Sequence, residues 1–203
     1  MGLLPQERTL HFGPLQPDNA GMTLEFTTSH LKDSIEVLRY YKRLGERAIA
    51  QVEDQALLAA PDGQSNSIAI IVKHLAGNMR SRFTDFLTSD GEKPDRNRDQ
   101  EFMVGAGVTR SEIMEGWEKG WRLVYDTLKS LTPHDLTREV TIRSEPHSVL
   151  QAVTRQLAHC SQHIGQIIYL AKYLRGPEWK TLSIAKGQSA AVNAAMAEKF
   201  KLR

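Results

Sequence analysis

Residues 148–174 have the sequence SVLQAVTRQLAHCSQHIGQIIYLAKYL, and this stretch decides the expected fold. Its apolar residues recur at intervals of three or four, or at sums of these, which is the period of an amphipathic α-helix. Ser148 and Gln151 form a capping-box pattern at the start, and Gly176-Pro177 follow the end. The sequence therefore predicts one long helix from Ser148 to about Leu174.

Three other stretches have the same period. Apolar spacing predicts a first helix from about Met22 to Val52 and a second from Ile68 to about Phe86. A third helix is expected to open at the capping box of Thr109 with Glu112 and to end before Pro133. Residues 1–21, which contain three prolines, are expected to form an irregular leader.

Four helices of this length can bury a shared core, so we expect an all-α fold. Short connections make the first two and the last two helices antiparallel neighbours, whereas the irregular stretch 89–108 provides a long crossover between helices two and three. The expected topology is an up-down-down-up four-helix bundle with an extra C-terminal helix near Ala190 to Lys199. The alternating segment 139–143 is either a small hairpin or a turn.

Composition indicates a single domain over residues 1–203. The 26 lysines and arginines against 24 acidic residues leave a net charge of only +2, which argues against nucleic acid as a partner. No apolar run approaches the roughly 18 residues that cross a bilayer, so no membrane association is expected. A single cysteine, Cys160, excludes an internal disulfide, and together with the lack of a signal-peptide pattern it favours a cytoplasmic protein.

Two histidines in the fourth helix are the strongest chemical signal. His159 and His163 are four residues apart, so both imidazoles lie on one helix face beside the apolar stripe. His74 on the second helix is a candidate third ligand, and three neutral imidazoles would leave a divalent metal with open positions. The alternative is that these are ordinary core histidines held by local hydrogen bonds, because their positions in the sequence do not establish that His74 lies near His163.

A family resemblance favours the metal site. The segments NSIA (66–69), KHLAGN (73–78) and HCSQHIGQI (159–167) resemble the DinB superfamily of metal-binding four-helix bundles. That resemblance implies that His74, His159 and His163 hold a divalent ion, with zinc or nickel as the expected metals. Segments 84–94 and 179–189 are similar to an uncharacterised branch. Other branches contain thiol-dependent S-transferases and maleylpyruvate isomerases, so a low-molecular-weight thiol is loosely implied as a cofactor.

Neighbouring polar residues are candidates for supporting roles. Asn78, Gln156 and Gln166 each lie about one helical turn from a candidate ligand and are expected to orient the imidazoles, unless they are simply surface amides.

The connection between the second and third predicted helices is also a candidate part of the site. Asp85, Asp90 and Arg96 are expected at the mouth of the cleft, and the segment from Asp85 to Glu101 is expected to shape access to the metal. A solvated charged loop is the alternative.

These expectations favour a metal-dependent enzyme. The ion would acidify a bound thiol or water for attack on a small electrophilic substrate, as in an S-transferase or hydrolase. The alternative is a non-enzymatic, stress-linked metal-binding or dimeric interaction bundle. A homodimer is expected, with the aromatic-rich third helix and the tail around Trp179 as the candidate contact surface. Trp117 and Trp121 on that helix are either core residues or interface anchors.

Overall fold

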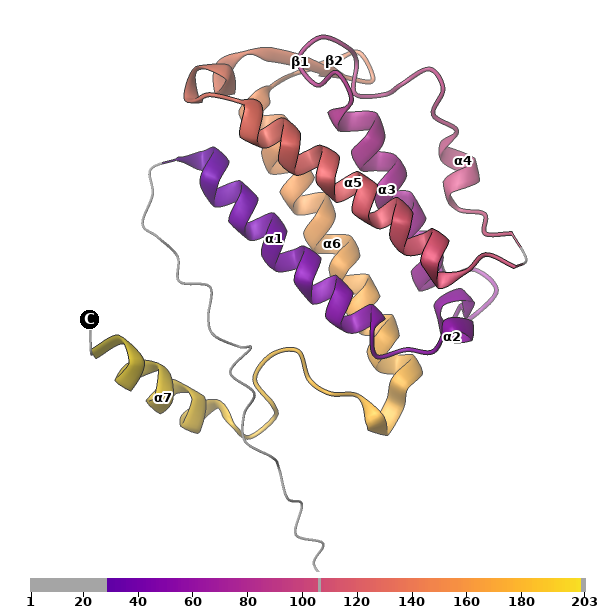
Figure 1. The fold of residues 1–203 in the computed structure, drawn as a ribbon, viewed down its shortest axis with the longest axis vertical. Helices are drawn as coiled ribbons and strands as arrows, with labels where there is room; N and C mark the ends of the chain where they lie inside the picture. Colours follow the sequence, from indigo (N-terminus) through magenta and orange to yellow (C-terminus); the bar gives the residue numbers. More distant parts are fainter. Residues whose placement is uncertain (1–28, 106, 202–203) are drawn as a thin grey trace, which may run out of the picture.

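The computed structural model describes residues 29–105 and 107–201. The described chain is mostly helical with one small two-stranded sheet, which confirms the all-α expectation at that level. Figure 1 shows four long helices lying side by side, with the sheet at one end. The expected leader, 1–21, lies outside the described residues.

The first two long helices are α1, His30–Ile49, and α3, Ile68–Phe83. The sequence predicts a helix up to Val52, but α1 ends at Ile49 and a short helix α2, Asp54–Leu58, follows. Ser67 caps α3 by accepting a hydrogen bond from the Ile70 amide at 3.3 Å. The end of α3 comes earlier than Phe86, because Thr84 is extended and Asp85 takes a left-handed φ of 47°.

The other two long helices are α5, Arg110–Ser130, and α6, Val149–Arg175. Both expected capping boxes are present: Thr109 with Glu112 opens α5, and Ser148 with Gln151 opens α6. Between them lie a 3-10 turn, Pro133–Thr137, and an antiparallel hairpin of β1, Glu139–Ile142, with β2, Glu145–Ser148. A second 3-10 turn, Gly176–Glu178, and the C-terminal helix α7, Ser189–Lys201, follow α6.

The helices pack in pairs that differ from the expected neighbours. The most extensive contacts join α3 to α5 and α1 to α6, and smaller ones join α3 to α6 and α1 to α5. The sequence instead predicts α1 beside α3 and α5 beside α6, because short connections usually join adjacent helices. Here the connection from α1 to α3 contains α2, and the connection from α5 to α6 contains the hairpin. These insertions allow the second helix of each pair to lie diagonally opposite the first in the bundle.

The core is a single apolar cluster between the four long helices. Trp117 and Trp121 of α5 are only 1% and 0% exposed, so they are core residues and not interface anchors, which decides between the two roles that the sequence leaves open. Within residues 29–105 and 107–201, no helix is both long and apolar enough to cross a membrane.

The connection from α3 to α5 is more ordered than its sequence indicates. It contains a short helix, α4, Arg98–Glu101, whose N-cap Asn97 accepts a hydrogen bond from the Gln100 amide. α4 contacts α3. This connection therefore folds back along the helix that carries His74, and it brings new side chains to the candidate site.

Candidate metal centre

The structure brings the three predicted histidines together. One ring nitrogen from each of His74, His159 and His163 lies within 4.8 Å of the other two. His74 comes from α3, and the other two come from successive turns of α6. The Nε2 atoms of His74 and His159 are 3.3 Å apart, and the ring centroid of His163 lies 5.0 Å and 4.5 Å from those of His74 and His159.

Hydrogen bonds fix two of the three rings. Nδ1 of His74 lies 2.9 Å from Oε2 of Glu101, and Nδ1 of His163 lies 2.7 Å from Oε1 of Gln166. An ionised carboxylate and an amide oxygen are acceptors, so each imidazole donates from Nδ1 and keeps the Nε2 lone pair free. Such partners commonly orient metal-binding histidines. The expectation for Gln166 is thus matched by a direct contact.

Glu101 is the main component of the site that sequence reasoning missed. Its carboxylate is buried, and it accepts hydrogen bonds from Arg96 at 2.8 Å and 3.0 Å besides the one from His74. Burial alone would raise the pKa of Glu101, but the hydrogen bonds from His74 and Arg96 and the charge of Arg96 hold it below its usual value. Glu101 therefore remains ionised and can keep His74 in one tautomer.

Gly77 makes room for this carboxylate. A Cβ atom at position 77 would lie 2.3 Å from Oε1 of Glu101. Gly77 is three residues after His74 on α3, where glycine costs roughly 0.5–1 kcal/mol relative to alanine. A glycine on the ligand-bearing face of a helix was the available signal that another side chain packs against it.

Burial keeps His159 and His163 neutral. It lowers the pKa of His159 to about 3, and nearby His163 and His74 act in the same direction. Burial also lowers the pKa of His163, although the hydrogen bond with Gln166 opposes this shift. Both rings are therefore unprotonated at neutral pH, which is the state that binds a metal.

The geometry fits a divalent metal ion. Zinc–nitrogen bonds are about 2.0–2.1 Å long, so two ligands of a tetrahedral ion have nitrogens roughly 3.3 Å apart. The 3.3 Å separation between Nε2 of His74 and Nε2 of His159 agrees with that value. Nδ1 of His159 is buried and lacks a hydrogen-bond partner among the described residues, so no hydrogen bond at Nδ1 orients this ring. Imidazole ligands suit zinc, nickel, copper and iron alike.

The other two amides do not touch the imidazoles in the described contacts. Gln156 is buried and donates to Sγ of Cys160 at 3.3 Å instead. Asn78 is also buried, and its Oδ1 atom has no hydrogen-bond partner among residues 29–105 and 107–201. Asn78 lines the same cavity as His74, although its Oδ1 atom is buried.

A cavity of about 340 Å³ opens onto the histidines. His74 and His159 form part of its wall, together with residues from the α3–α5 connection, the hairpin and α6. Of the three residues expected at the mouth, Arg96 lines this cavity. Asp85 and Asp90 are not among its lining residues.

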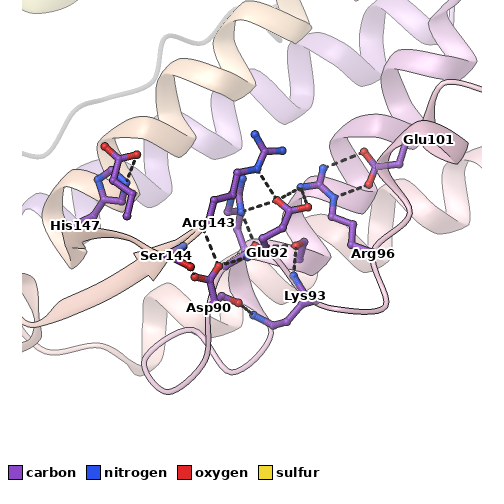
Figure 2. Close-up of polar contacts among 12 residues, drawn as sticks. Asp90, Glu92, Lys93, Arg96, Glu101, Arg143, Ser144 and His147 are labelled. Atoms are coloured by element: carbon purple, nitrogen blue, oxygen red, sulfur yellow. Dashed lines mark hydrogen bonds and ion pairs between the residues drawn. The ribbon is translucent and has the colours of Figure 1, made fainter.

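Asp90 has a different role, which Figure 2 shows: it ties the connection to the hairpin. Its carboxylate accepts from the backbone amides of Glu92, Arg143 and Ser144 at 2.7, 2.9 and 2.7 Å. Burial alone would raise the pKa of Asp90, but these hydrogen bonds lower it to about 2. Arg143 and Ser144 have φ values of 56° and 63°, so Asp90 stabilises a tight hairpin turn beside the cavity.

One protein family matches this chain. Its model, described as "Protein of unknown function (DUF1572)", matches residues 25–188, which include all three histidines, Glu101 and the cavity. The comparison with curated proteins gave no match.

Proposed function

The chain belongs to the DUF1572 family, whose function is unknown, and we propose that it is a metal-dependent enzyme acting on a small electrophilic substrate. The proposed metal ligands are His74, His159 and His163. The proposed reaction is the transfer of a low-molecular-weight thiol to the substrate, or hydrolysis of the substrate. Zinc or nickel is the proposed metal.

One observation carries this proposal: two of the three histidines face a cavity. A metal that only tied α3 to α6 would need no open space beside it, and structural zinc sites usually have four protein ligands. Three imidazoles leave a coordination position free, and the cavity gives that position access to a small molecule. This argues against the alternative of a non-enzymatic metal-binding bundle.

When bound, the metal would lower the pKa of a thiol or water ligand and so supply the nucleophile at neutral pH. The protein residues supply orientation and charge. Glu101 accepts a hydrogen bond from the Nδ1–H group of His74 and increases the basicity of its Nε2 atom, while Gln166 holds His163 in the matching tautomer. Phe83 and Phe86 line the cavity and give it an apolar side.

We also propose that the family is a branch of the DinB superfamily with an up-down-down-up four-helix bundle. The support is the combination of one histidine on α3 with an i, i+4 pair on α6. The close packing of α3 on α5 is further support, because the long connection between them suits two parallel neighbours.

A thiol-conjugation screen tests the activity. Tag-free protein, either treated with EDTA or loaded with zinc or nickel, is mixed with low-molecular-weight thiols and chloronitroarene or epoxide electrophiles, with activated esters as the hydrolysis arm. We expect turnover that EDTA abolishes and metal restores. His163→Ala should be inactive, whereas His134→Ala, which alters an exposed histidine, should remain active. Turnover that is insensitive to EDTA and to His163→Ala would contradict the proposal, and metal binding without turnover in any arm would favour the non-enzymatic alternative.

A further inference from the structure

The cavity beside the histidines has a positively charged wall. Five arginines line it, and no aspartate or glutamate is among its lining residues. The five are Arg82, Arg96, Arg98, Arg143 and Arg155.

Three of these arginines share nearby carboxylates. Figure 2 shows that Glu92 pairs with Arg96 and Arg143, and it pairs with Arg82 as well. Arg96 also binds Glu101. Two carboxylates therefore pair with three of the five guanidinium groups, which leaves an excess of three positive charges around the cavity. Asp90 and Lys93 in the same connection carry opposite charges and do not change this excess.

Arg98 and Arg155 carry most of the uncompensated charge. Arg98 lies over the ring of Phe102, 4.9 Å from its centroid, and has no carboxylate partner in the described part of the chain. The side chain of Arg155 makes no hydrogen bond or ion pair with any residue in the described ranges. It precedes His159 by four residues on α6, so its guanidinium and the histidine lie on one helix face.

Part of the remaining wall is apolar. Phe83 and Phe86 stack with ring centroids 5.1 Å apart, and Val140 and Ile142 of the hairpin complete this side. Because a guanidinium fork matches the two oxygens of a carboxylate or phosphate, such a cavity suits a ligand with one anionic end and an apolar body. Its volume of about 340 Å³ is near the lower limit for small-molecule sites.

We propose that this cavity binds a small organic anion, with Arg98 and Arg155 holding a carboxylate or phosphate group and Phe83 and Phe86 contacting the apolar body. The identification of that anion as the substrate rests on the proposed function. Anion binding itself does not, because the arginines are independent of the metal.

Fluorine NMR titration tests this site in the presence of EDTA. The probes are para-fluorobenzoate, para-fluorophenyl phosphate and the neutral para-fluorobenzamide. We expect both anions to bind saturably and more tightly than the amide, with affinity that falls as sodium chloride is added. The anion that binds more tightly identifies the preferred head group.

Two variants test whether the anion binds at Arg98 and Arg155. Arg98→Gln and Arg155→Gln should each weaken anion binding about tenfold, since each removes a charge-assisted contact. Both residues are exposed, so the variants should fold, and thermal unfolding verifies this. Arg47→Gln, at an exposed position of α1, is the matched control and should bind like the wild type.

Three results would overturn the proposal. These are equal affinity for the amide and the acid, wild-type affinity in both arginine variants, or no saturable binding of either anion. Because EDTA is present throughout, anion binding without metal-dependent turnover would leave this inference standing while the proposed enzyme function fails.

Discussion

Replacement of Glu101 by glutamine tests whether a residue that is not itself a proposed metal ligand supports the metal centre through His74. The carboxylate accepts three hydrogen bonds, one from His74 and two from Arg96. Glutamine keeps the size and one acceptor oxygen but removes the charge and turns an NH₂ group toward one of these donors. His74 then has a weaker partner, and Arg96 loses one of its two carboxylates.

The magnitude follows from these contacts. Removing one partner of a buried ion pair costs about 3–5 kcal/mol. Arg96 retains Glu92 at 3.2 Å and 3.4 Å, and the amide oxygen still accepts a hydrogen bond, so we expect a loss of about 2 kcal/mol in unfolding free energy. For a chain of this size that lowers Tm by about 4–8 °C. Loss of a histidine-orienting partner should weaken metal binding about 10- to 100-fold.

The assay is a competition titration of zinc against a chromophoric chelator, paired with thermal unfolding. Glu115→Gln is the matched control, because Glu115 lies on α5 in a surface pair with Lys119. Glu115→Gln should change neither the zinc affinity nor the Tm measurably. Wild-type zinc affinity in Glu101→Gln would refute the inference that Glu101 supports the site through His74.

Three further predictions concern the same architecture. Gly77→Ala should weaken metal binding as Glu101→Gln does, because the new Cβ displaces the Glu101 carboxylate; an unchanged zinc affinity would contradict this. Metal-free protein should lose unfolding free energy as the pH falls from about 6.5 toward 3, because burial lowers the pKa of His159 to about 3 from an unfolded value of about 6.5. Chemical denaturation at stepped pH should show that the unfolding free energy changes less steeply with pH in His159→Asn than in His134→Asn. Equal slopes would refute the assignment of this pH dependence to His159. Light scattering should return twice the 22.8 kDa chain mass, and a monomer mass would exclude the homodimer.

Local sequence signals predict the helices better than their arrangement. The capping boxes at Thr109 and Ser148 depend on side chains three residues apart, so the starts of α5 and α6 can be predicted directly. Packing partners depend on the paths of the connections. The insertion of α2 and of the β1–β2 hairpin, which sequence leaves open as a hairpin or a turn, moves the paired helices onto the diagonal.

The sequence also predicts some residues of the candidate site and not others. The spacing of His159 and His163 predicts one helix face, and His74 is a candidate third ligand that the resemblance supports; the structure brings all three together. Glu101 could not be predicted in the same way, because it approaches from a connection without periodicity, 27 residues along the chain from His74. Arg155 could not be predicted either, because an arginine on an amphipathic helix normally faces water, and the cavity that Arg155 lines is formed with residues of α3, the α3–α5 connection and the hairpin.

The metal content of tag-free protein tests the central claim most directly. Elemental analysis of the wild type and of His163→Ala, purified in parallel, measures bound ions per chain. We expect about one zinc or nickel ion per wild-type chain and almost none in the variant, with nearly unchanged helical circular dichroism because the apolar core does not depend on the ion. One tightly bound ion per chain in His163→Ala, or none in the wild type after incubation with zinc and nickel, would contradict the three-histidine site.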